Sequence, residues 1–93
     1  MTAKEKIKKE PVETADRNTG NERFLILHND DYHSFDYVIE SLIEICEHDH
    51  EQAVQCTMLT HYKGKCDVKK GSFDYLSPMK KALNARQLEA TID

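Results

Sequence analysis

The sequence predicts a two-layer α+β domain with the element order β-α-α-β-α-β. Three patterns lead to this prediction: a short apolar run at 24–28, a helically spaced apolar stripe over 35–46, and alternation of apolar with polar residues at 65–69 and 88–92. A single sheet with helices packed on it buries all of these apolar faces. With 93 residues, the chain has room for one domain at most.

The first predicted element is a strand over residues 24–28. Its sequence, FLILH, is a short apolar run, which is typical of a strand buried on both faces. The run stops at the polar segment 29–31, NDD, which favours a turn and places negative charge near the start of the next helix.

The second predicted element is a helix over residues 35–46. Its apolar residues recur three or four positions apart, with acidic residues on the other side, as in an amphipathic helix. The stripe consists of Phe35, Val38, Ile39, Leu42, Ile45 and Cys46. Ile43 lies off the stripe, so a second contact or a small exposed patch is expected there.

A second helix is predicted to begin at Asp49 and to end at Gly64. Asp49 and Gln52 have the spacing of a capping box. Glycine readily adopts the left-handed conformation that commonly follows the last helical turn, which other residues resist. The alternating segment 65–69 then predicts a strand with one wet face.

A third helix is predicted between this strand and the end of the chain. Ser72 could cap it, but Pro78 would lie in its interior and remove a backbone hydrogen bond. Either a tight turn over 73–76 precedes a new helix, or one helix carries a kink. We favour an early turn that merges into a helix ending near Ala85. The alternating residues Leu88, Ala90 and Ile92 predict a closing strand.

Residues 1–22 are predicted to be a disordered extension that precedes the folded domain, residues 23–93. Ile7 and Val12 are the large apolar residues of this extension, which otherwise mixes Lys and Glu with turn-forming residues. Such a segment cannot bury enough apolar surface to offset the entropy lost on ordering.

Charge and cysteine content exclude several classes of protein. The net charge of −4 argues against nucleic-acid binding and suits a cationic ligand. Cys46, Cys56 and Cys66 lack a CxxC pair, so free buried thiols are expected rather than a disulfide framework or structural zinc. No apolar run is long enough for a membrane span or a signal core, so we expect a soluble, cytoplasmic protein.

Two local features are candidates for function. The loop Asn29-Asp30-Asp31 offers amide and carboxylate acceptors without Lys or Arg, which suits a ligand with N–H donors, although an ordinary turn explains Asn-Asp equally well. His61, in HYKGK at the end of the second helix, is the other, although a lone helical histidine is more often structural.

Enzymatic and metal-dependent functions have little support. His48 and His50 are two residues apart and face different directions on a helix, and neither HxxxH nor HExxH occurs. A nucleophile motif and a glycine-rich phosphate loop are also missing. We therefore expect neither an enzyme, a metal site nor a cofactor.

Taken together, FLILHNDDYHSFDYVIESL, DHEQAVQCTMLTHYKGK and LEATI resemble the ClpS adaptor family over nearly all of residues 24–92. The NDDY loop and the HYxGK helix end are the most specific elements. The resemblance implies the same β-α-α-β-α-β fold behind a disordered tail. It also implies an adaptor that binds N-terminal residues (N-degrons) and delivers proteins to a Clp protease.

The resemblance also implies where the ligand binds. Asn29, Asp30 and His61 would bind the free α-amino group, whose three donors need three acceptors, and Asp31 would support the loop. An apolar pocket for a first residue of Leu, Phe, Tyr or Trp would be lined by Phe35, Val38, Thr57, Thr60 and Leu88, the last on the closing strand. On periodicity alone, Phe35, Val38 and Leu88 would be ordinary core.

Three residues depart from the family pattern. His33 stands where a capping Thr is common, Phe35 where Met is frequent, and Thr57 where a bulky Met often screens the pocket. We expect these changes to alter discrimination among first residues, with some tolerance of Ile or Val.

The implied partners are N-degron proteins and the N-terminal domain of a Clp-family AAA+ ATPase, with the chain acting as a monomer. Lys65, Asp74 and Lys80 are weak candidates for the ATPase contact, and the N-terminal extension is a further one. The alternatives are a peptide- or amine-binding module without delivery, and a small metal-binding protein.

Overall fold

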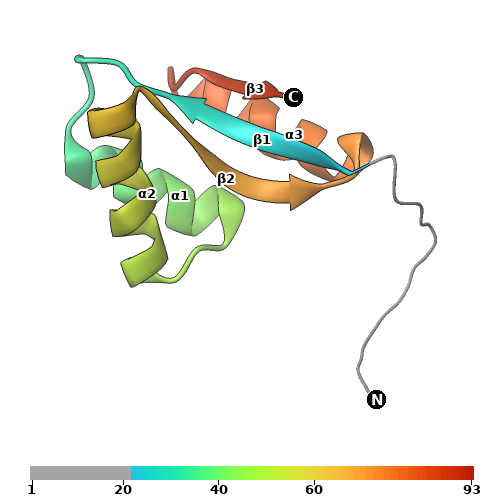
Figure 1. Cartoon of the computed structure of the whole chain (residues 1–93), viewed down its shortest axis with the longest axis horizontal. Coiled ribbons are helices and arrows are strands. Elements are labelled where there is room, and N and C mark those ends of the chain that lie inside the picture. The colour runs from blue at the N-terminus through green and yellow to red at the C-terminus, as the bar shows by residue number, and fades with distance from the viewer. Residues whose placement is uncertain (1–21) are drawn as a thin grey trace.

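The computed structural model describes residues 22–93, and Figure 1 shows its elements. The predicted disordered extension, residues 1–22, lies outside the described residues except for Glu22. The element order confirms the predicted β-α-α-β-α-β fold. The elements are β1 (Arg23–His28), α1 (Phe35–Cys46), α2 (His50–Lys63), β2 (Lys65–Gly71), α3 (Phe73–Ala85) and β3 (Ala90–Ile92).

The three strands form one antiparallel sheet in the order β2-β1-β3. In Figure 1, α3 runs behind the sheet, and α1 and α2 lie together at one side. The central strand β1 supplies Leu25 and Leu27, which are fully buried with Leu42 of α1 and Leu83 of α3. The core therefore lies between the sheet and the helices, as expected for two layers.

Side-chain caps fix where each helix begins. Asp49 accepts a hydrogen bond from the backbone N–H of Gln52 over 2.8 Å, which is one of the two bonds of the predicted capping box. Ser72 caps α3 in the same way. The cap of α1 is Ser34 rather than His33, since the Ser34 hydroxyl accepts from the N–H of Tyr37 over 3.2 Å. The expectation that His33 occupies the capping position is wrong by one residue.

The early turn that we favoured for the third helix is wrong, because α3 is continuous through Pro78. An interior proline costs about 3 kcal/mol, since it lacks an N–H and crowds the preceding turn. The helix also buries Leu76 and Leu83 completely, and each contributes roughly 1.5–3 kcal/mol. Tertiary packing thus outweighs the local penalty. The predicted end at Ala85 is confirmed.

The closing strand is shorter than the alternation of apolar residues indicated. Leu88 was expected on this strand but precedes it, in the connection that follows α3. Gln87 has a left-handed φ of 68°, and the N–H of Leu88 donates to the carbonyl of Leu83 over 3.1 Å. The chain is therefore still leaving the helix at Leu88, which is 2% exposed and packs in the core.

The three cysteines are free: Cys46 and Cys56 are buried, and Cys66 is half-buried. Burial raises the pKa of the Cys46 thiol to about 11, so this thiol stays protonated and behaves as a small apolar group. Among residues 22–93, no helix is long and apolar enough to cross a membrane.

Candidate functional site

The loop between β1 and α1 is held by Asp30. Oδ1 of Asp30 accepts hydrogen bonds from the backbone N–H groups of Tyr32 and His33, both over 2.9 Å. An aspartate that bonds to the backbone two and three residues ahead closes a tight turn. The loop therefore has a defined shape although none of its residues is fully buried.

His33 adds a side-chain contact to the same carboxylate. Its Nδ1 lies 3.1 Å from each oxygen of Asp30, and its ring stacks on Tyr37 of α1 with centroids 4.9 Å apart. The pKa of Asp30 lies below its ordinary value. Partial burial, the largest single influence, would raise it, but the hydrogen bonds from His33 and Tyr32 together outweigh burial. Asp30 thus keeps its charge in moderately acidic solution.

Asp31 was expected to support the loop, and its contacts are few. Its exposed carboxylate accepts one long hydrogen bond, of 3.5 Å, from Nδ2 of Asn29. This contact turns the amide nitrogen of Asn29 toward Asp31, which leaves the amide oxygen of Asn29 as an acceptor. The backbone N–H groups of Tyr32 and His33 bond to Asp30 and not to Asp31.

His61 is placed by the last turn of α2. The helix ends at Gly64, whose φ of 93° is left-handed and whose N–H donates to the carbonyl of Thr60 over 2.9 Å. The exposed ring of His61 meets the ring of Phe35 edge to face, with centroids 5.1 Å apart. A histidine from α2 thus contacts the first residue of α1.

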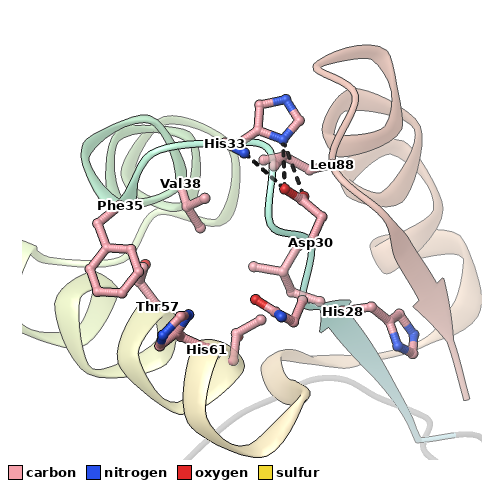
Figure 2. Close-up of a pocket in the computed structure, with 11 residues that line it drawn as sticks. His28, Asp30, His33, Phe35, Val38, Thr57, His61 and Leu88 are labelled. Atoms are coloured by element: carbon pink, nitrogen blue, oxygen red, sulfur yellow. Dashed lines mark hydrogen bonds and ion pairs between the residues drawn. The ribbon is translucent and has the colours of Figure 1, made fainter.

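These elements surround a cavity of about 20 Å³. In Figure 2, Phe35, Thr57 and His61 lie on one side of it, with Asp30 and Leu88 on the other. All residues predicted for the amine site and the side-chain pocket line this cavity. The lining residues are Leu27, His28, Asn29, Asp30, His33, Phe35, Val38, Thr57, Thr60, His61 and Leu88.

Leu27, His28 and His33 also line the cavity, and sequence reasoning did not place them there. Nε2 of His28 lies 2.8 Å from the hydroxyl of Thr91 on β3, so His28 also links two strands. Their positions next to the NDD segment were the available signal. Whether these side chains line the cavity depends on how the strands and helices pack together, which a local pattern cannot show.

The two threonines of the wall differ in their hydrogen bonds. Both are buried, with Thr57 3% and Thr60 5% exposed. The Thr60 hydroxyl donates to the carbonyl of Cys56 over 2.7 Å. The Thr57 hydroxyl has no hydrogen-bond partner among residues 22–93. The wall therefore contains one satisfied and one unsatisfied hydroxyl.

The three residues predicted for contact with the ATPase are not gathered in one patch. Lys65 begins β2, whereas Asp74 follows the other end of that strand, in the first turn of α3. Seven strand residues span roughly 20 Å. Asp74 and Lys80 share α3, and Lys65 lies apart from Asp74.

The histidines considered for metal binding differ in their surroundings. His48 is buried, and its Nε2 lies 2.6 Å from the carbonyl oxygen of Val68. His50 is exposed in the first turn of α2. Within residues 22–93, no group of three His, Cys, Asp or Glu side chains could hold a metal ion.

Comparison with known proteins gives consistent matches. The family model described as "ATP-dependent Clp protease adaptor protein ClpS" matches residues 19–91. A ClpS adapter protein from Oleidesulfovibrio alaskensis is 45% identical over 40 residues, or 43% of this chain. That alignment spans 38% of the relative's length.

A solved structure, Agrobacterium tumefaciens ClpS2 bound to L-phenylalaninamide, superposes with a TM-score of 0.73. It covers 78% of this chain and 95% of the ClpS2 chain at 20% sequence identity. At this identity the likeness establishes the fold.

Proposed function

The chain belongs to the ClpS family of ATP-dependent Clp protease adaptors, which are not enzymes, and from this we propose a specific role for the cavity. The cavity binds the free α-amino group and the bulky apolar side chain of a protein's first residue. The adaptor then delivers that protein to a Clp ATPase–protease. The observation that carries the proposal is that Asn29, Asp30 and His61 line one cavity together with the apolar side chains of Phe35, Val38 and Leu88.

The polar side of the cavity suits an ammonium group. The amide oxygen of Asn29, the carboxylate of Asp30 and a neutral nitrogen of His61 are three acceptors from two elements. Oδ1 of Asp30 already accepts hydrogen bonds from two backbone N–H groups. Among the described residues, Oδ2 contacts only the ring of His33. Oδ2 therefore has lone pairs for a ligand, and an ionised acceptor strengthens such a bond.

Charge also favours a cation at this position. None of the residues that line the cavity, all within 22–93, is Lys or Arg. The neighbouring Asp31 adds a second exposed carboxylate whose contact with Asn29 is long. An acetylated N-terminus offers one donor and no charge, so the site discriminates against it.

The apolar side must widen to admit a large side chain. A cavity of about 20 Å³ has room for little more than one water molecule. Phe35 is 40% exposed at the first position of α1, so its ring can swing outward without opening the core. Burying a Leu or Phe side chain in the widened cavity supplies about 2–3 kcal/mol. The contacts with the amine supply the remaining selectivity.

Fluorescence anisotropy with a labelled peptide that begins with Phe tests binding. The variants Asp30→Ala and Asp31→Ala separate the roles of the two carboxylates. Asp30→Ala should lower both affinity and the free energy of unfolding, because two backbone N–H groups lose their acceptor. Asp31→Ala should lower affinity alone. If neither variant changes affinity, the amine site is elsewhere.

Delivery requires a complex with the ATPase. Co-migration of the full chain with the isolated N-terminal domain of a Clp ATPase in size-exclusion chromatography tests it. Peptide binding without co-migration would instead indicate a module that sequesters or senses N-terminal residues.

A further inference from the structure

Thr57 carries a buried hydroxyl that the fold leaves unpaired. Its side chain lines the cavity and is 3% exposed, and Oγ1 has no partner within residues 22–93. Helical Ser and Thr residues commonly donate to the carbonyl four positions earlier. Thr60 and Ser41, both buried, do so over 2.7 and 2.8 Å. Among the buried hydroxyl groups on the described helices, Thr57 is therefore the exception that makes no such bond.

An unpaired hydroxyl in this wall distinguishes between ligands. Phe35, Val38 and Leu88, which line the same cavity, offer no polar side-chain atom. The Thr57 hydroxyl is already buried without a partner among the described residues, which is unfavourable, and a purely apolar ligand would leave it so. A ligand side chain with a polar atom at its far end would supply that partner.

The position of Thr57 along α2 restricts which polar side chains can reach it. Thr57 precedes His61 by four residues, so both lie on one helix face about 6 Å apart along the axis. An ammonium group held at His61 leaves Thr57 beyond the reach of a short side chain such as Ser. The phenol oxygen of Tyr lies at the end of a long, rigid, apolar ring and can both donate and accept.

We propose that the Thr57 hydroxyl is a specificity determinant that favours Tyr over Phe as the first residue of the bound protein. The inference rests on the proposed function, since it assumes that the first side chain enters this cavity. Phe35 swings aside, the tyrosine ring takes the apolar wall, and its hydroxyl pairs with Oγ1 of Thr57. Phe fills the same space but leaves Oγ1 unpaired.

The test compares two peptides that differ only in beginning with Tyr or Phe, bound to the full chain and to Thr57→Val. Valine keeps the branched shape and removes the hydroxyl. The unmodified chain should bind the Tyr peptide about 3- to 10-fold more tightly, the range of one net hydrogen bond. Thr57→Val should abolish or reverse this ratio. An unchanged ratio in Thr57→Val would overturn the inference.

Two further variants serve as controls for the role of the Thr57 hydroxyl. Thr57→Ser keeps the hydroxyl and should retain the preference for Tyr, which separates the hydrogen bond from a change in packing. Thr60→Val removes a hydroxyl that already has a partner, so it should change both affinities by the same factor. If the affinity of both peptides is indifferent to N-terminal acetylation, the proposed function itself fails. If acetylation abolishes binding but the ratio of Tyr-peptide to Phe-peptide affinity is the same in Thr57→Val as in the unmodified chain, only this inference fails.

Discussion

The backbone N–H of Asn29 donates a hydrogen bond to the carbonyl oxygen of Gly64 over 2.9 Å. This bond ties the loop that follows β1 to the residue that ends α2. It sets the distance between the acceptors of the loop, Asn29 and Asp30, and the ring of His61 one turn before the helix end. The alignment of the proposed amine site thus depends on a backbone contact made by a left-handed glycine.

Replacing Gly64 should therefore loosen the site through the backbone. The φ of 93° is unfavourable for an alanine by about 1–2 kcal/mol, although no atom lies within 4 Å of where its Cβ would be. We expect Gly64→Ala to lower the free energy of unfolding in urea by about that amount and to weaken peptide binding. Gly64→Asn should lose less, because Asn tolerates the left-handed region. Equal stability of all three proteins would contradict this explanation.

Removing the His61 ring should weaken binding of a peptide with a free N-terminus. The loss of one hydrogen bond to a charged group costs about 1.5–3 kcal/mol, so His61→Ala should raise Kd by roughly 10- to 150-fold. His50→Ala is the matched control, because His50 is exposed at the opposite end of α2 and does not line the cavity. Calorimetric titration of both variants would reject the assignment if they lost affinity equally.

The reshaped pocket should accept β-branched first residues. Thr57 is smaller than the Met that often screens the pocket in the family, and Phe35 is 40% exposed, so its ring has space to turn outward. We expect matched peptides beginning with Leu and Ile to differ in affinity by less than a hundredfold, because one rearranged methyl is worth about 1–3 kcal/mol. A Leu preference above a hundredfold in fluorescence anisotropy would contradict this expectation. It would show that the pocket excludes β-branched first residues as strictly with Thr57 as with a Met at that position.

The Asp30 carboxylate should stabilise the fold down to moderately acidic pH. Partial burial would raise the pKa of Asp30, but the hydrogen bonds from His33 and Tyr32 outweigh burial and lower it. A carboxylate with a lowered pKa stabilises the fold above its ordinary pKa and loses that effect as the pH falls through its lower folded value. The difference in free energy of unfolding between the unmodified chain and Asp30→Asn should therefore stay constant from about pH 7.5 to 5.5 and shrink below about pH 4. Urea unfolding at each pH measures it, and a difference that shrinks already between about pH 7.5 and 5.5 would contradict the lowered pKa.

Local sequence patterns predicted most of the fold because helix faces, caps and C-terminal glycines are determined by residues close together in the sequence. The apolar stripe of α1, the Asp49 cap and Gly64 each act within a few residues, and the helix limits agree with them. Pro78 misled the prediction because its local penalty is outweighed by Leu76 and Leu83, whose burial depends on the whole sheet. Leu88 was misplaced because alternation cannot show where strand pairing begins.

The candidate site was less accessible to local reasoning. Periodicity treats Phe35, Val38 and Leu88 as core, and the resemblance to the ClpS family is what placed them together with His61. The same reasoning missed His28 and His33, because their approach to the cavity depends on packing between β1, α1 and β3. The unpaired hydroxyl of Thr57 has no signature in the sequence, since it differs from Thr60 only in its hydrogen bonds.

Recognition of a free α-amino group is the claim from which the proposed function follows. The most direct measurement is the affinity of the full chain for one peptide that begins with Phe, prepared with a free and with an acetylated N-terminus. We predict that the free peptide binds and that acetylation raises Kd at least a hundredfold, since it removes the charge and two of the three donors. Equal affinity for the two peptides would contradict the amine site formed by Asn29, Asp30 and His61.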